Sequence, residues 1–186
     1  MTRFTQYTME TAPDNSKPQL AHAKKVWSFI PTLHASLAES PIALEAYNHL
    51  FDLMGKASLS PVEQQIALLT VSVFHGCEYC TMGHTYVARS VKAPETAIQA
   101  VRDGQPIPDK RLQTLRAFIE VMLRERGHVP AGTVDEFIAA GFTRAQVLEV
   151  IVAIATKTIS NYANHVVETP KEAFMSDPAF QWTARR

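Results

Sequence analysis

Signals that start and stop helices recur along almost the whole chain and leave little room for strands. Ser60-Pro61-Val62-Glu63 is a capping box with proline at the first helical position, and Thr143 with Gln146 repeats the capping pattern. Thr133 with Glu136 fits it as well. Four of the seven glycines fall where a helix should end, namely Gly55, Gly104, Gly127 and Gly141. Because residues 109–126 have helical periodicity and no sustained period-two run occurs, we predict an all-α bundle of about eight helices.

Length, charge and cysteine content narrow the class of protein. The 186 residues fit a polar N-terminal arm over residues 1–18 and a single helical domain over residues 19–186. The 18 basic and 18 acidic residues are intermixed, which gives no footprint for nucleic acid and no basic patch for a membrane surface. No signal-like N-terminus and no apolar run of about 18 residues occurs, so we expect a cytoplasmic protein without a membrane span.

The only two cysteines, Cys77 and Cys80, are three positions apart, and His84 follows four positions later. On a helix that starts near Gly76, the three side chains lie within about 60° of one another. Both sulfurs then sit in the first turn, where the helix dipole lowers the pKa of a thiol. A histidine one turn away can accept or donate the proton that thiol chemistry requires. The spacing therefore favours a redox dithiol at the N-terminus of a core helix.

Three other interpretations of this cluster are disfavoured but stay open. A structural metal site is closed by four ligands, so it would need a distant histidine such as His49, His128 or His165. A thioredoxin-type motif would need a preceding strand, and none is evident. Two small buried hydrophobes beside a core histidine would need no chemistry at all.

The stretch "LSPVEQQIALLTVSVFHGCEYCTMGHT" resembles the alkylhydroperoxidase AhpD / carboxymuconolactone decarboxylase superfamily, over a core of roughly residues 40–110. The later stretch "TKTISNYANHVVETPKEAF" resembles its peroxidase-related branch. The resemblance implies an all-helical fold, a homo-oligomer (trimer or hexamer), and a Cys-x-x-Cys pair that reduces hydroperoxides. It implies no cofactor and no metal. The oxidised pair would be reduced again by a dithiol protein or a small thiol.

The resemblance also assigns roles to residues. Cys80 corresponds to the cysteine that attacks the peroxide, Cys77 to the resolving cysteine, and His84 to the histidine of a proton relay. The helix dipole alone would make Cys77 the more acidic thiol, so the order of acidity stays open. Two supporting positions depart from the family: Gln65 stands where a relay glutamate is expected, and Tyr79 where a second histidine is expected. Because glutamine cannot shuttle a proton, the rate of peroxide reduction is uncertain.

A second polar stripe lies on the last long helix, where Lys157, Asn161, Asn164 and His165 share a face opposite apolar residues. We interpret this stripe as a solvated face or an oligomer contact. The sharper hypothesis is that Asn164 or His165 lines a pocket at the dithiol.

Three functions follow from these patterns. The first is a thiol-dependent hydroperoxidase that acts through Cys80, Cys77 and His84. The second is a carboxymuconolactone decarboxylase-type lyase with His84 as the acid–base group, although such a reaction has no use for a dithiol. The third is a non-enzymatic redox-sensing protein whose disulfide state controls assembly.

Overall fold

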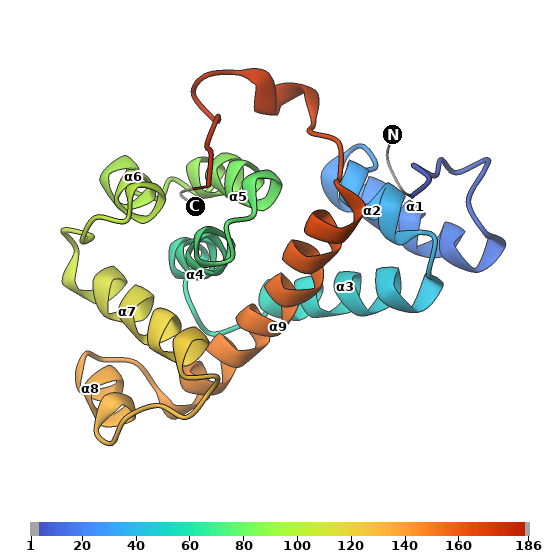
Figure 1. Ribbon diagram of the computed structural model, residues 1–186. Helices are drawn as coiled ribbons and strands as arrows, with labels where there is room; N and C mark the ends of the chain where they lie inside the picture. The colour runs from blue at the N-terminus through green and yellow to red at the C-terminus, as the bar shows by residue number, and fades with distance from the viewer. Residues whose placement is uncertain (1–3, 185–186) are drawn as a thin grey trace.

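The computed structural model describes residues 4–184, and the regular secondary structure within that range is entirely helical (Figure 1). This confirms the all-α prediction, with nine α-helices among the described residues where about eight were expected. The elements in chain order are η1 (Asp14–Ser16), α1 (Lys17–Trp27), α2 (Thr32–Leu37), α3 (Pro41–Met54), α4 (Pro61–Phe74), α5 (Glu78–Ser90), α6 (Glu95–Asp103), α7 (Lys110–Arg124), α8 (Thr133–Ala139), α9 (Arg144–Val167) and η2 (Ala173–Ser176).

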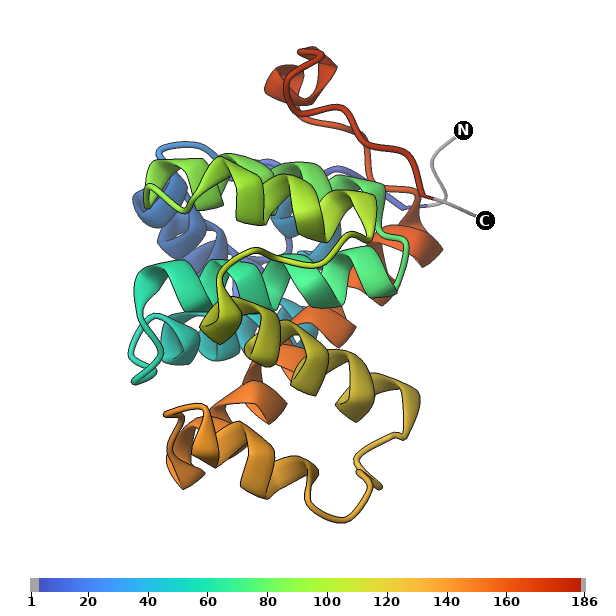
Figure 2. The same cartoon turned by 90° about the vertical axis from the view of Figure 1, so that its left-hand side faces the viewer.

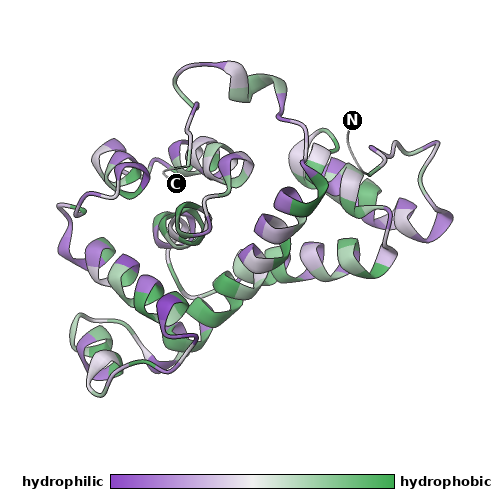
Figure 3. Cartoon of the chain, in the orientation of Figure 1, coloured by the Kyte–Doolittle hydropathy of each residue, from purple (hydrophilic) through white to green (hydrophobic). Residues whose placement is uncertain are grey.

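Helix α4 is the centre of the fold, and the helices α5, α6, α7 and α9 pack around it (Figures 1 and 2). Its apolar side chains are almost completely buried, including Ile66, Leu68, Leu69 and Val71. Figure 3 accordingly shows α4 as largely hydrophobic around its circumference. A helix that is apolar on all sides is stable only inside a protein. Because the whole helix is buried, polar side chains on α4 such as Gln65 are buried as well.

Two of the three predicted capping boxes are confirmed. The Ser60 hydroxyl accepts from the Glu63 amide at 3.3 Å, and the Glu63 carboxylate accepts from the Ser60 amide at 2.7 Å. Thr143 and Gln146 make the same pair of bonds at the start of α9. The third predicted capping box, Thr133 with Glu136, was wrong. Gly132, with a φ of 85°, is the residue before α8, so Thr133 already lies inside the helix and its side chain caps nothing.

The N-terminal arm packs against the body over its described residues. The Tyr7 amide donates to the Ala35 carbonyl at 3.2 Å, and the Ser16 hydroxyl donates to the Ala38 carbonyl at 2.7 Å. Ala12 is 5% exposed and belongs to the apolar cluster between α1, α2 and α3. The arm therefore covers part of the core through buried contacts.

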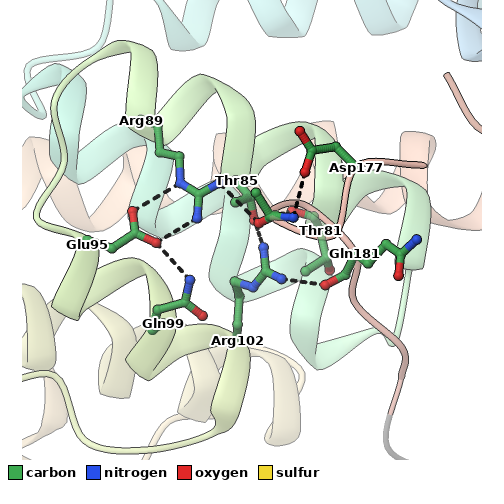
Figure 4. A network of polar contacts seen from close by, with 9 residues as sticks. Thr81, Thr85, Arg89, Glu95, Gln99, Arg102, Asp177 and Gln181 are labelled. Atoms are coloured by element: carbon green, nitrogen blue, oxygen red, sulfur yellow. Dashed lines mark hydrogen bonds and ion pairs between the residues drawn. The ribbon is translucent and has the colours of Figure 1, made fainter. Parts of the chain in front are cut away.

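The C-terminal segment, residues 168–184, leaves α9 and returns across α5 (Figure 1). Arg102 of α6 donates to the Gln181 carbonyl at 2.6 Å and accepts, through its own carbonyl, from the Trp182 indole at 2.9 Å. Arg89 of α5 donates to the Ala179 carbonyl at 3.1 Å. Figure 4 shows the network around these two arginines, which reaches Thr85 on α5 and Glu95 on α6. These bonds hold η2 over the first half of α5.

Helix α9 carries its polar side chains inward. Its buried residues include Lys157, Asn161 and Asn164, whereas the apolar side chains of Ile151 and Tyr162 are exposed. The expectation of a solvated polar stripe was therefore wrong for all of its members except His165, which is exposed. Within residues 4–184 no single helix is long and apolar enough to cross a membrane, and α8 with α9 reach that length only as a pair bent by 113°.

We predict that Ser60→Ala lowers the free energy of unfolding by about 1 kcal/mol, because the Glu63 amide at the start of the central helix loses its partner. Urea denaturation measures this change. Ser90→Ala is the matched control: its exposed hydroxyl donates to the Tyr86 carbonyl inside α5, and its loss should change stability by less than about 0.5 kcal/mol. Equal effects of the two substitutions would contradict the capping assignment.

Candidate active site

The start of α5 places both sulfurs in one helical turn. Gly76, with a φ of 66°, turns the chain out of α4, and the Cys77 amide then donates to the Ser72 carbonyl at 3.0 Å. Cys77 is the residue immediately before α5, and Cys80 lies in its first turn. Both are free thiols and are only 1% and 4% exposed, respectively. The predicted Cys-x-x-Cys at a helix N-terminus is thus confirmed.

Helix α9 covers the two sulfurs with polar groups. The Asn164 amide nitrogen lies 3.1 Å from the Cys80 sulfur and 3.8 Å from the Cys77 sulfur. The Ser160 hydroxyl lies 3.8 Å from the Cys80 sulfur. Lys157, one turn earlier, is 1% exposed and lines the same cavity as Cys80, and its positive charge lowers the pKa of Cys80. Asn164 therefore contacts both sulfurs but does not line the cavity, whereas Lys157, expected on a solvated face, does line it, and Ser160 was missed.

These contacts give the two thiols opposite acidities. Burial on its own would raise the pKa of Cys80, but hydrogen bonding with Cys77, Lys157 and Ser160 and the positive charge of Lys157 bring it well below its ordinary value. The pKa of Cys77 is raised, because its thiol hydrogen-bonds to Cys80 and because it is buried. This order is the reverse of the one that the helix dipole alone would give. The polar groups of α9 lie closer to the Cys80 sulfur, since the Asn164 amide is 3.1 Å from it and 3.8 Å from the Cys77 sulfur.

His84 and Gln65, which the family resemblance placed at the positions of a proton relay, are in contact. The His84 Nδ1 and the Gln65 side-chain oxygen are 3.0 Å apart in the interior. Burial and the charge of Lys157 lower the pKa of His84 well below its usual value, so its ring is neutral at neutral pH. Since an amide oxygen only accepts, Nδ1 carries the ring proton and Nε2 presents a lone pair. Gln65 therefore fixes the tautomer of His84.

Tyr79 points away from the sulfurs. Its hydroxyl donates to the Glu172 carboxylate at 2.7 Å, and the same carboxylate accepts from the Thr32 amide at 2.6 Å. Burial raises the pKa of Tyr79, so the hydroxyl keeps its proton. Tyr79 thus ties the C-terminal segment to the start of α2. His165, the other tentative pocket residue, is exposed and does not line the pocket.

A cavity of about 250 Å³ opens onto Cys80. Its walls are mainly aromatic, and the C-terminal segment closes one side with Glu172, Phe174 and Met175. The polar groups at its inner end include Cys80, His84 and Lys157, whereas Cys77 does not reach it. The aromatic wall residues are Trp27, Phe29, Tyr47, Phe51, Tyr79, Tyr86 and Phe174. The arrangement exposes one acidic sulfur to a small apolar molecule and keeps the second sulfur behind it.

The described part of the chain holds no group of three His, Cys, Asp or Glu side chains that could bind a metal ion. The three histidines considered as a fourth ligand, His49, His128 and His165, are all exposed. Neither Cys77 nor Cys80 therefore gathers a ligand set around it within this range.

We predict that iodoacetamide modifies Cys80 before Cys77 at pH 7, because the thiolate is the nucleophile and Cys80 holds the lowered pKa. Peptide mass spectrometry after short exposure identifies the modified sulfur. In Cys77→Ser, Cys80 should still be modified at pH 7, because the charge of Lys157 remains beside it. Preferential modification of Cys77 in the reduced wild type would contradict the order of acidity.

Residues 41–118 match the carboxymuconolactone decarboxylase family. No curated protein sequence matches the chain. The matched range contains both cysteines, Gln65 and His84, so the site described above falls inside the family region.

Solved structures extend the similarity to the whole fold. A peroxidase-related protein from Ralstonia eutropha JMP134, described as an alkylhydroperoxidase AhpD core, has a TM-score of 0.81 at 19% identity and covers 96% of this chain and 94% of its own. A peroxidase-related protein from Silicibacter sp. TM1040 has a TM-score of 0.76 at 17% identity, covering 95% and 96%. The debrominase Bmp8 in complex with 2,3,4-tribromopyrrole has a TM-score of 0.72 at 18% identity, covering 93% of each chain. Residues 41–118 are therefore similar to the carboxymuconolactone decarboxylase family, and the chain as a whole has the fold of these alkylhydroperoxidase AhpD-like structures.

Proposed function

We propose that the protein is a thiol-dependent peroxidase that reduces organic hydroperoxides through a dithiol–disulfide cycle at Cys80 and Cys77. The observation that carries this proposal is the Cys80 sulfur itself. It is the acidic member of a Cys-x-x-Cys pair and faces an apolar cavity, while the second thiol lies directly behind it. The peroxidase-related names of two similar structures agree with this chemistry.

The reaction proceeds in two steps. The Cys80 thiolate attacks the outer oxygen of the hydroperoxide and the O–O bond breaks, which leaves a sulfenic acid on Cys80 and releases the alkoxide, protonated to an alcohol. The Cys77 thiol then attacks the Cys80 sulfur, and the hydroxyl leaves with the thiol proton as water. Sulfur is oxidised by two electrons and the peroxide is reduced by two. Two further thiol equivalents reduce the disulfide and restore the pair.

The cavity favours hydroperoxides that carry a small apolar or aromatic group over hydrogen peroxide, because burial of apolar surface contributes to their binding. The reductant is a dithiol protein or a small thiol. Since both sulfurs are almost fully buried, a small thiol that enters the cavity reaches Cys80 more directly than a folded protein does. Exposed apolar side chains on α9, including Leu148, Tyr162 and Val166, support a homo-oligomer. Its size of three or six subunits and its place in the cytoplasm belong to the proposal and rest on the family resemblance.

The test is a titration of free thiols in the reduced protein with cumene hydroperoxide. One equivalent should consume both thiols of the chain within seconds, with one alcohol released per disulfide. Cys80→Ser should abolish the reaction. Cys77→Ser should stop it at a sulfenic acid, which dimedone traps and mass spectrometry detects.

Other outcomes identify the competing functions. Two intact thiols after excess peroxide would contradict the proposal and favour the lyase, in which neutral His84 is the base. If both thiols are oxidised once, no reductant supports repeated turnover, and the oligomer changes size, the redox sensor is favoured.

A second candidate function, reductive dehalogenation of a small aromatic ring, is supported by the aromatic cavity walls and the fold of Bmp8. Release of bromide from a bromopyrrole, with loss of both thiols, would support that reaction.

A further inference from the structure

Lys157 is an unusual residue for its position. It is 1% exposed in the middle of α9, and a buried ammonium is stable only when an opposite charge or several hydrogen-bond acceptors surround it. Seven ion pairs occur in the part of the chain that the structure describes, and none of them involves Lys157. No carboxylate therefore neutralises this charge within residues 4–184.

The neighbours of Lys157 are the reactive groups of the site. It lines the same cavity as Cys80 and His84, and it lies one turn before Ser160 on the face of α9 that covers the sulfurs. Asn164, two turns after Lys157, donates to the Cys80 sulfur at 3.1 Å. An anionic sulfur would give the buried ammonium the counter-charge that no acid provides. A neutral thiol would leave it unpaired.

Gln65 and His84 cannot supply a proton to a reactant at Cys80. Its amide oxygen holds the Nδ1 proton of His84, and an amide can neither take nor supply a proton at neutral pH. The neutral His84 ring has no proton to spare on Nε2. Among the groups that line the cavity close to Cys80, the Lys157 ammonium is the one that carries a charge and three donors.

We propose that Lys157 is a catalytic residue that forms an ion pair with the Cys80 thiolate in the reduced protein and protonates the oxygen that leaves during peroxide cleavage. The second role rests on the proposed peroxidase function, and the first does not. In the reaction, the thiolate breaks the O–O bond, the alkoxide takes a proton from the ammonium, and an alcohol and a neutral amine result. Lys157 regains its proton from solvent after the disulfide has formed and has been reduced.

Other titratable groups lie around Cys80 and also influence the pH at which its thiol ionises. On α5 these are Cys77 and His84. Tyr47 on α3 and His75 at the end of α4 interact with the Cys80 charge at longer range. His34 and Glu172 line the more distant walls of the cavity. Because Lys157 is the one side chain in this set that brings a positive charge to the reduced site, its removal should have the largest effect on the acidity of Cys80.

The first experiment follows the rate of iodoacetamide modification of Cys80 against pH, which needs no peroxidase activity. Lys157→Met should move the midpoint upward by one unit or more and slow modification at pH 7 about tenfold. Lys157→Arg keeps the positive charge and should keep the pH midpoint of Cys80 modification. Because a guanidinium is a weaker acid than an ammonium, the variant should still reduce kcat/KM for cumene hydroperoxide at least tenfold. Lys171→Met is the matched control, because Lys171 is exposed and pairs with Glu78 at the surface.

The second experiment uses the wild-type protein and does not depend on a variant that folds. Oxidation to the disulfide removes the thiolate, so the buried ammonium loses its counter-charge and its surroundings change. NMR of 15N-labelled lysine side chains, recorded at one pH in the reduced and oxidised states, should therefore show a shifted Lys157 resonance and an unchanged Lys171 resonance. An unchanged Lys157 resonance between the two states, or an unchanged midpoint in folded Lys157→Met, would overturn the ion pair. If the ion pair holds but peroxide is not reduced, the proposed function and the proton-donor role fail, and the ion pair stands.

Discussion

The contact between the first turn of α5 and the buried polar face of α9 is the interaction on which the site depends. It joins residues about 80 positions apart in the chain and brings the Asn164 amide to 3.1 Å from the Cys80 sulfur. Inside a protein, polar groups without partners are costly, so the sulfur and the polar side chains of α9 stabilise one another. The central helix α4 holds the two helices in place, because both pack against it.

This contact also explains how Cys80 can be acidic although Gln65 replaces the glutamate expected in the proton relay. In the position of the expected glutamate, Gln65 orients His84 but cannot move its proton. The acidity of Cys80 arises instead from hydrogen bonds and from a buried cation on another helix. The two cysteines differ accordingly: the sulfur at the cavity is the acidic one, and the sulfur behind it keeps its proton until the second step.

Much of the fold and half of the site could be predicted from the sequence, since both rest on local patterns. Capping residues such as Ser60 fix helix starts within a few positions, and helical spacing alone places Cys77, Cys80 and His84 on one stripe. The inward polar face of α9 could not be predicted in this way. An amphipathic pattern shows that a helix has two faces, but the partners that pack against it decide which face is buried. The sequence did hold one signal for this inward face. Lys157, Ser160 and Asn164 are spaced three and four positions apart, as Cys77, Cys80 and His84 are.

The C-terminal segment illustrates the other limit of local patterns. Glu172 meets the Tyr79 hydroxyl from 93 positions away, and this contact closes one side of the cavity. Neither residue has a local feature that predicts the pair. The consequence is that two segments far apart in the chain together bound the cavity that reaches Cys80.

The account depends most directly on the charge of Cys80 in the resting protein. Ultraviolet absorbance of the reduced wild type at 240 nm, titrated from pH 10 to pH 4, counts thiolates without any reagent. We predict one thiolate per chain at pH 7 that disappears only well below the ordinary pKa of a thiol, and that is absent in Cys80→Ser. A reduced wild-type protein with no thiolate at pH 7 would contradict the account.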